Sequence, residues 1–597
     1  MSKEKTAKII NKAPCKRLYE RVLDVKDFCR IIEKHGNRVL FTYFDKKRQL
    51  HDVTYGEFTA KVKSLAAALT DRGYAGKRIA IIGETSVEWV ASYLAVLASG
   101  GVAIPLDKEL EISVIEGFMD SVDADALVYS ASFNGKFANA VRDHSSLSLF
   151  IAMAPNEAEL SLGDKVVALD SLLEKGAELV KEGYVIPDVE NRDRLAEFLF
   201  TSGTTGTSKC VMLSQKNIFS VVTSAAATVD FTPDDTIVSL LPIHHTYELA
   251  CMLAGMDYGM HICINDSITH VLKNLQIFKP TGLVLVPLYV YTFYKRIWAE
   301  AKKTGRDKKL KLGITAARSL LKVGVDKRRE LFAEVLNSFG GRLEKIVCGG
   351  AALNPRMIEF FDTLGIAIYE GYGITECAPL TCVVPYYKRK YASVGPSVPC
   401  CQVRIAQGYK NDKGYMEGEI QVKGDNVMLG YYNNENGHPV DVERFYDNIM
   451  NRFKWGEVKN NKNYYADETI RRMIYTHRNL IAMLTQVMMN KKVSDEMVFN
   501  VLEKWYSEFP SEIIPYDAVR DNSIAVAAAY KILHDKARNN DIGNTAQAYA
   551  DGHLGCVELL DGSFIPSIDA DFLTVTPFLG SESLHPFIDV CVKNSKG

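Results

Sequence analysis

The stretch that decides the fold is residues 198–214, which read FLFTSGTTGTSKCVMLS. It begins as an apolar strand at Phe198, and Ser214 is placed to cap a following helix. Between them, Thr201–Lys209 holds four threonines, two serines, two glycines and one lysine. The stretch therefore predicts a strand, a polar loop and a helix in succession, which is typical of an α/β fold.

The composition of this loop favours polyphosphate binding. Glycines let successive backbone N–H groups turn toward one point, hydroxyls add donors, and Lys209 adds a positive charge. The loop is not a Walker A motif, because only two residues separate Gly203 from Gly206 and no glycine precedes Lys209. This spacing argues against a P-loop phosphotransferase. A flexible surface hairpin is the alternative that composition alone leaves open.

Strands and helices alternate on both sides of the loop. Residues 78–83 form a short β-branched run typical of a strand buried on both faces, and Ser86 is a plausible cap for a helix over 87–99. A strand at 102–106 follows, so the order predicts a parallel sheet. Further strands are expected at 126–129, 149–153, 237–241, 283–286 and 345–347.

Composition narrows the class of protein. The 597 residues carry 71 Lys+Arg against 73 Asp+Glu, a formal net charge of −2, with 47% hydrophobic residues. This is a globular composition, and the near-neutral charge argues against nucleic-acid binding. No run of about 18 apolar residues predicts a membrane span, and residues 1–5 do not read as a signal peptide. We therefore expect a cytoplasmic protein with reduced thiols.

Several motifs together resemble the adenylate-forming superfamily, which includes acyl-CoA synthetases, peptide-synthetase adenylation domains and luciferases. The loop at 201–209 resembles its signature loop. The other matching segments are LPIHHTYE at 241–248, GGAAL at 349–353, YEGYGITE at 369–376, GEI at 418–420 and VMLGYY at 427–432. The resemblance covers about residues 17–436. It implies a large domain of layered α/β sheets with a small β subdomain.

The resemblance also implies a reaction and a site. A carboxylate joins the α-phosphorus of ATP and expels pyrophosphate, and CoA then displaces AMP to give a thioester. By motif match, Glu376 holds Mg²⁺, Thr375 donates to the α-phosphate, Lys209 is the third catalytic residue, and Tyr372 lies against adenine. The remaining residues assigned to the nucleotide are Thr201, Ser202, Gly203, Thr204, Thr205, Gly206, Gly349, Gly350, Ala351, Glu370, Gly371 and Gly373.

Two features bear on the carboxylate substrate. One of His244 and His245 is expected at the mouth of the acyl or pantetheine channel, the alternative being hydrogen-bonded loop histidines. Their spacing predicts no zinc site. Between residues 301 and 330 lies a basic segment with interleaved apolar residues, placed like an insert of the long-chain acyl-CoA synthetases. It favours a long-chain fatty acid. The segment either rests on an anionic membrane surface or is a solvated basic face.

The pattern changes after residue 437. The Thr-Gly-Asp hinge, the Gly-Arg-x-Lys strand and the late lysine of the superfamily do not follow. The sequence predicts a synthetase large domain at 1–437, an unrelated, mainly α-helical tail at 438–537, and an unassigned segment at 538–597. The tail resembles the soluble helical tail of a family of bacterial membrane proteins with a glycosyltransferase-like core. Its partner is not indicated.

The missing segments leave two functional expectations. The first is fatty-acid activation with impaired thioester formation. The alternative is a non-catalytic nucleotide- or acyl-binding remnant, or a mis-joined fusion with a helical interaction module. Activity is expected to separate these readings, because only the first requires pyrophosphate release.

Overall fold

A computed structural model describes residues 21–143, 147–201, 208–410 and 414–432, with short pieces at 446–452, 488, 497–498, 500–501, 504, 556–558 and 564–566. The chain divides into two units. The larger contains Met1–Thr201 and Lys209–Tyr432, and the second contains Ser202–Ser208 and Asn433–Gly597. The two are described separately.

The first sheet of the larger unit has eight strands in the order β18-β9-β8-β4-β3-β5-β6-β7. Strands β8, β4, β3, β5, β6 and β7 are parallel to one another, whereas β9 pairs antiparallel with both β8 and β18. Their bounds are β3 (Arg78–Ile82), β4 (Val102–Leu106), β5 (Ala126–Tyr129), β6 (Leu149–Ala152), β7 (Val166–Ala168), β8 (Leu195–Thr201), β9 (Lys209–Ser214) and β18 (Gly430–Tyr431). The polar loop thus connects two paired strands, β8 and β9.

The second sheet also has eight strands, in the order β15-β14-β13-β12-β10-β11-β1-β2. Its centre is parallel, and β15 and β2 pair antiparallel at the two edges. The bounds are β1 (Val39–Phe44), β2 (Leu50–Thr54), β10 (Thr236–Ser239), β11 (His261–Ile264), β12 (Gly282–Leu285), β13 (Lys345–Cys348), β14 (Ala367–Gly373) and β15 (Leu380–Val383).

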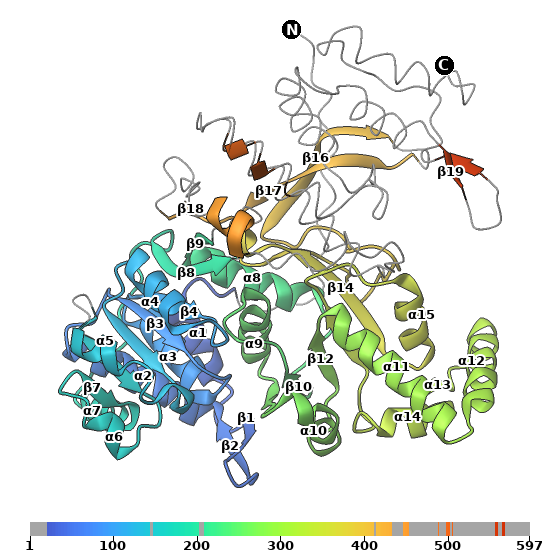
Figure 1. Cartoon of the computed structure of the whole chain (residues 1–597). Helices are drawn as coiled ribbons and strands as arrows, with labels where there is room; N and C mark the ends of the chain where they lie inside the picture. Colours follow the sequence, from blue (N-terminus) through green and yellow to red (C-terminus); the bar gives the residue numbers. More distant parts are fainter. Residues whose placement is uncertain are drawn as a thin grey trace, which may run out of the picture. The chain divides into compact units, whose positions relative to one another are not determined.

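Helices cover the faces of both sheets. In Figure 1, α8 and α9 lie in the middle of the unit, with the first sheet on one side and the second on the other. The longer helices are α1 (Val25–Glu33), α2 (Tyr55–Asp71), α3 (Val87–Ala98), α4 (Ile112–Ser121), α7 (Leu169–Lys181), α8 (Gln215–Thr228), α9 (Thr246–Tyr258), α10 (Val271–Phe278), α11 (Pro287–Lys303), α12 (Asp307–Lys322) and α15 (Pro355–Thr363). A separate hairpin is formed by β16 (Cys401–Lys410) and β17 (Met416–Gly424). This layered arrangement confirms the predicted α/β fold.

Local chemistry explains where these elements begin and end. Every residue of β4 and β5 is buried, as expected for parallel strands covered on both faces. Ser86 accepts a hydrogen bond from the Trp89 backbone N–H, and Ser214 forms a capping box with Asn217. Both predicted caps are confirmed. Gly100, with φ of +73°, follows α3 in the left-handed conformation that suits glycine.

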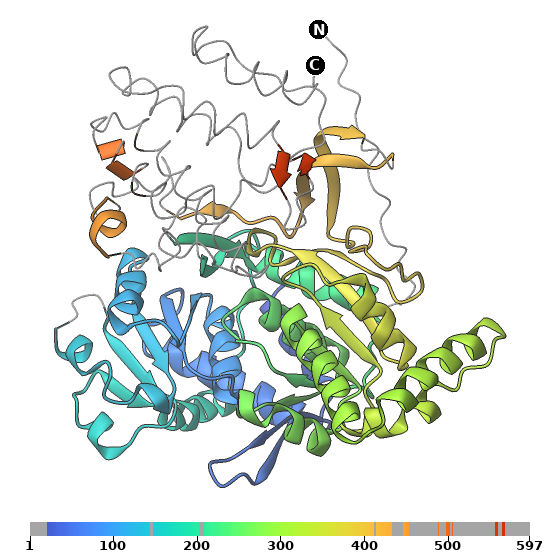
Figure 2. The same cartoon turned by 45° about the vertical axis from the view of Figure 1, so that its right-hand side comes forward.

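The second unit is described only in pieces. They include the π-helical turn Asn448–Arg452 and an antiparallel hairpin of β19 (Cys556–Glu558) and β20 (Phe564–Pro566). The predicted helical tail at 438–537 falls mostly outside the described residues, and the predicted boundary at 437 stays a prediction. Figure 2 gives a second view of both units. Among the described residues, no helix has the length and apolar character needed to cross a bilayer.

Candidate functional site

A cavity of about 630 Å³ lies against the carboxyl ends of the second sheet. Ligands of open α/β sheets bind at this edge. Helices α8 and α9 form one wall, and the segments that follow β10, β12, β13 and β14 form the other. Most of the lining is aliphatic or aromatic, and its polar rim holds the glycine segment 349–350 and the motif 371–375. An apolar channel and the predicted nucleotide motif therefore share one cavity.

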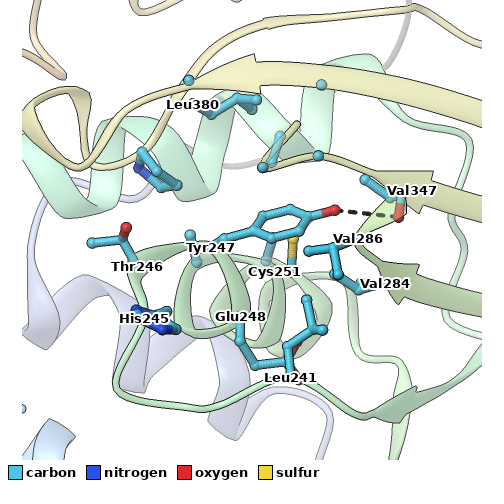
Figure 3. Close-up of a pocket in the computed structure, with 18 of the residues that line it drawn as sticks. Leu241, His245, Thr246, Tyr247, Glu248, Cys251, Val284, Val286, Val347 and Leu380 are labelled. Carbon is cyan, nitrogen blue, oxygen red and sulfur yellow. Dashed lines mark hydrogen bonds between the residues drawn. The ribbon is translucent and has the colours of Figure 1, made fainter. Parts of the chain in front are cut away.

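Tyr247 lies across this cavity, as Figure 3 shows. Its hydroxyl donates to the backbone oxygens of Leu285 and Val347, each at 3.2 Å, at the ends of two adjacent strands. A Cβ at Gly349 would come within 3.2 Å of the Tyr247 ring. The absence of a side chain at Gly349 therefore leaves room for this tyrosine, a packing reason that the sequence did not indicate.

Glu248 is a buried carboxyl in the wall of the cavity. It accepts hydrogen bonds from the Ser239 hydroxyl and the Leu241 backbone, which ties α9 to the end of β10. Burial raises the pKa of Glu248 to about 8, so the carboxyl is mainly protonated at neutral pH. Its Oε2 atom is buried and has no protein partner among the described residues.

The two neighbouring histidines occupy different places. His245 lines the cavity at the start of α9, and His244 lies with its Nε2 atom 3.7 Å from Asp107. Burial, with the neighbouring His245, lowers the pKa of His244 to about 4, and burial also lowers that of His245. Both rings are neutral at pH 7, so the contact of His244 with Asp107 is not an ion pair there. Of the two, His245 is the one with access to a bound substrate.

The motif YEGYGITE runs along β14 and into the turn that follows it. Gly371, Tyr372, Gly373 and Thr375 all line the cavity. A Cβ at Gly373 would lie 1.7 Å from the Pro379 carbonyl oxygen, so only glycine allows β14 to approach the start of β15 this closely. The turn that follows ends at Glu376, which contacts Tyr431 on the first sheet.

Glu370 has a different role from the residues that follow it in the motif. It is 8% exposed, and burial raises its pKa while the Leu353 backbone N–H donates to it. This hydrogen bond therefore holds the segment GGAAL at 349–353 against β14. Ala351, on that segment, is exposed, and Gly350 adopts φ of +82°.

Lys209, at the start of β9, and Glu376, at the end of this motif, both contact Tyr431 on β18. The Tyr431 hydroxyl donates to Glu376 Oε1 at 2.6 Å, and the Lys209 ammonium lies 5.0 Å from the centre of the Tyr431 ring. Partial burial and the bond to Glu376 raise the pKa of Tyr431 to about 12, so the hydroxyl stays a donor. Thr201 pairs with Lys209 across the base of the loop. Ser202, Gly203, Thr204, Thr205 and Gly206 lie outside the described residues.

The residues present fit a magnesium ion shared with phosphates. Glu376 is a half-exposed carboxylate, and it forms no ion pair with a lysine or arginine in the described part of the chain. Within that part, no group of three or more His, Cys, Asp or Glu side chains could enclose a metal. Mg²⁺ is commonly held by one or two carboxylates together with substrate phosphates and waters. A single carboxylate near the Lys209 ammonium, with Tyr431 in contact with both, suits that arrangement.

Comparison with known proteins decides the family. The model of the AMP-binding enzyme family matches residues 28–432, which is more than half of the chain. The chain belongs to this family. The predicted membership in the adenylate-forming superfamily is thereby confirmed.

Curated relatives of this AMP-binding enzyme include two mammalian proteins. Rat long-chain-fatty-acid–CoA ligase 5 is 27% identical over 404 residues, covering 64% of this chain and 58% of its own. Human long-chain-fatty-acid–CoA ligase 1 is 26% identical over 426 residues, covering 64% and 57%. The chain thus spans somewhat more than half the length of the curated relatives it matches.

Solved structures show the same fold. A long-chain-fatty-acid–CoA ligase (FadD1) from Archaeoglobus fulgidus aligns with a TM-score of 0.54 at 15% identity, covering 72% of this chain and 80% of that one. The N-terminal domain of FACL13 from Mycobacterium tuberculosis aligns with a TM-score of 0.50 at 18% identity, covering 69% and 92%. These likenesses support the layered α/β fold of this AMP-binding enzyme.

Sequence reasoning gave no role to four residues of the site: Tyr247, Glu248 and Tyr431, which it placed only within matching motifs, and Cys251. Tyr247, Cys251 and Tyr258 recur at helical spacing and all line the cavity, so their common face was detectable as a stripe on α9. For Tyr431 the motif VMLGYY gave a place in the family pattern but not the partner, because Glu376 lies 55 residues away in the sequence.

Proposed function

We propose that this AMP-binding enzyme activates a fatty acid with ATP, forming an acyl-adenylate on the way to acyl-CoA. The observation that carries the proposal is the single cavity in which an apolar channel opens onto the glycine segment and the YGIT residues. The names of the curated relatives support the same substrate class. An adenosine and an aliphatic chain each find a matching surface there.

The channel follows α9, which sets a length for the acyl chain. Tyr247 and Tyr258 both line the cavity and are eleven residues apart on the helix. At a rise of about 1.5 Å per residue, they are about 16 Å apart. An extended alkyl chain advances about 1.25 Å per carbon, given C–C bonds of about 1.5 Å. We therefore propose that the channel takes about 12 to 13 carbons.

The chain's own residues position the reactants. Thr375 donates to the α-phosphate from the cavity rim, and Tyr372 lies against the adenine. The 201–209 loop and the Lys209 ammonium neutralise the β- and γ-phosphates. Attack by a carboxylate on a polyanion depends mainly on such positioning and charge neutralisation. The neutral His245 ring lies where the carboxylate enters, because it lines the cavity at the start of α9.

Glu376 would hold Mg²⁺ through its remaining carboxylate oxygen. When bound, the ion neutralises phosphate charge. The carboxylate is oriented by the Tyr431 hydroxyl on its other oxygen. Pyrophosphate exchange should therefore require both the divalent ion and the Glu376 carboxylate.

We propose further that the thioester step is impaired. The sequence after 437 lacks the Thr-Gly-Asp and Gly-Arg-x-Lys segments that belong to the second half-reaction in the superfamily. The second candidate, binding without catalysis by a remnant or a mis-joined fusion, rests on the same observation. Pyrophosphate exchange with dodecanoate separates them, because only an active adenylating domain exchanges label. Acyl-CoA production at the rate of exchange would refute the impairment.

The metal role has a direct test. Isothermal titration of ATP with and without Mg²⁺ is compared between wild type, Glu376→Gln and Glu182→Gln, an exposed control carboxylate at the end of α7. We expect only Glu376→Gln to lose the gain in affinity that Mg²⁺ gives. Equal gains in all three proteins would remove Glu376 from the metal role.

We also propose that the protein is cytoplasmic and that α11 and α12 bring it to the surface of an anionic membrane. Leu312 and Val323 are each 72% exposed, and lysines surround them on α12. A groove of about 600 Å³ with an apolar floor opens between the two helices and α14 (Ala333–Asn337). Apolar residues bordered by lysines are typical of helices that lie in the membrane interface.

The membrane proposal is tested by vesicle sedimentation. Binding to phosphatidylglycerol vesicles, and not to phosphatidylcholine vesicles, is the expected result. Leu312→Ser should weaken it, and Leu160→Ser, an exposed leucine on α6 (Glu157–Leu160), should not. If the two variants bind the vesicles equally well, the basic segment is a solvated face and not a membrane contact.

A further inference from the structure

The short strand β18 joins two parts of the site that are distant in sequence. Its residues Gly430 and Tyr431 pair with Met212 and Val211 of β9, the strand that leaves the phosphate loop. Two residues earlier, the Met428 backbone N–H donates to the Glu376 carbonyl oxygen at 2.9 Å. Residues 428–431 are therefore hydrogen-bonded on one side to β9 and on the other side to Glu376, the last residue of the motif YEGYGITE.

Tyr431 uses both ends of its side chain at this junction. The hydroxyl donates a hydrogen bond to Glu376 Oε1 at 2.6 Å, and this bond sets the orientation of the carboxylate. The ring face lies 5.0 Å from the Lys209 ammonium, the geometry of a cation–π contact. One aromatic side chain thus contacts both the carboxylate and the cation that the proposed function assigns to Mg·ATP.

We propose that Tyr431 is a positioning residue that fixes the Glu376 carboxylate and the Lys209 ammonium relative to one another for binding of Mg·ATP. This inference rests on the proposed function, because it takes the metal role of Glu376 from there. Phenylalanine at 431 keeps the ring under Lys209 and removes the hydroxyl, so it separates the two contacts. Leucine removes both.

Tyr432 supplies a matched control. It is the next residue, it is also half-buried, and its hydroxyl accepts from Arg78 at 3.2 Å. Its ring packs against Phe198 with centres 4.7 Å apart, away from Glu376. Tyr432→Phe therefore removes a hydroxyl from the same segment without touching the proposed contacts.

The experiment measures ATP affinity by isothermal titration, once with saturating Mg²⁺ and once in EDTA. Loss of a residue that orients a metal ligand typically weakens metal binding about 10- to 100-fold. We expect Tyr431→Phe to weaken ATP binding at least about tenfold with Mg²⁺ and to leave binding in EDTA unchanged. Tyr431→Leu should weaken binding in EDTA as well, because Lys209 loses the ring. Tyr432→Phe should match wild type in both conditions.

The outcomes separate this inference from the proposed function. If Glu376→Gln keeps the full Mg²⁺ effect, the metal role itself is wrong. If Glu376→Gln loses that effect and Tyr431→Phe does not, only the positioning role of Tyr431 is overturned. A Tyr431→Phe variant that weakens binding equally with Mg²⁺ and in EDTA would show a general structural role and would also overturn it. Thermal denaturation of each variant confirms that the protein tested is folded.

Discussion

Ala254 offers the sharpest test of the acyl channel. It lies on α9, lines the cavity and is 6% exposed. It is seven residues beyond Tyr247 and four before Tyr258 on the same helix, so it stands about 10 Å along a channel of about 16 Å. Leucine at this position projects a branched side chain into the channel, and Ala254→Leu should therefore close its far third.

The size of the effect follows from the length that is closed. The last four residues of α9 correspond to about 6 Å, or about five carbons of an extended chain. At about 0.8 kcal/mol per buried CH₂, excluding them costs about 4 kcal/mol. That is a loss of affinity on the order of a thousandfold for a 12-carbon chain, and an 8-carbon chain should be little affected.

The assay uses non-hydrolysable acyl-sulfamoyl adenosines with 6, 8, 12 and 16 carbons and measures their affinity by isothermal titration. Wild-type affinity should rise up to about 12 carbons, whereas Ala254→Leu should reach its maximum near 8. The 6-carbon analogue serves as an internal control, because it does not reach Ala254. Ala254→Gly, which leaves the channel open, should follow wild type. A leucine variant that binds the 12-carbon analogue as tightly as wild type would refute the path along α9.

Two further predictions concern buried charged groups. Burial raises the pKa of Glu248 from 4.5 to about 8, so the folded protein binds a proton that the unfolded chain releases, and stability falls as pH rises from about 4.5 to about 8. In urea denaturation, the free energy of unfolding of wild type should fall by about 3 kcal/mol more than that of Glu248→Gln between pH 5 and pH 8, at about 1.4 kcal/mol per pH unit. Parallel plots of unfolding free energy against pH for the two proteins would contradict this prediction. Lys345 and Asp235 form a partly buried ion pair at 2.9 Å, so Lys345→Met should cost about 3 kcal/mol by leaving the buried Asp235 carboxylate without its cation. Asp235→Asn in the same chain should recover most of that loss, and no recovery would contradict the pairing.

Much of the fold was predictable because its signals are local. The strand at Arg78–Ile82 was indicated by a β-branched apolar run, and the helices after Ser86 and Ser214 by their capping side chains. Such patterns reflect interactions between residues a few positions apart, which any reader of the sequence can see. The alternation of strands and helices then predicted parallel sheets, as observed.

The order of the motifs also determined the family, because several short segments matched in sequence order. The role of each residue was less accessible. The resemblance assigned Gly349 to the nucleotide, and the structure shows that its open side faces the Tyr247 ring. Why a position requires glycine depends on which residues the fold places next to it.

The amino-acid sequence by itself determined the strands, the caps, the phosphate-compatible loop and the family to which these belong. Only the tertiary structure decided that Lys209, Glu376 and Tyr431 meet, and that Glu248 is protonated. The physical reason is distance along the chain. Contacts across 55 or more residues, and the burial that shifts a pKa, arise only when the sheets have packed around α8 and α9.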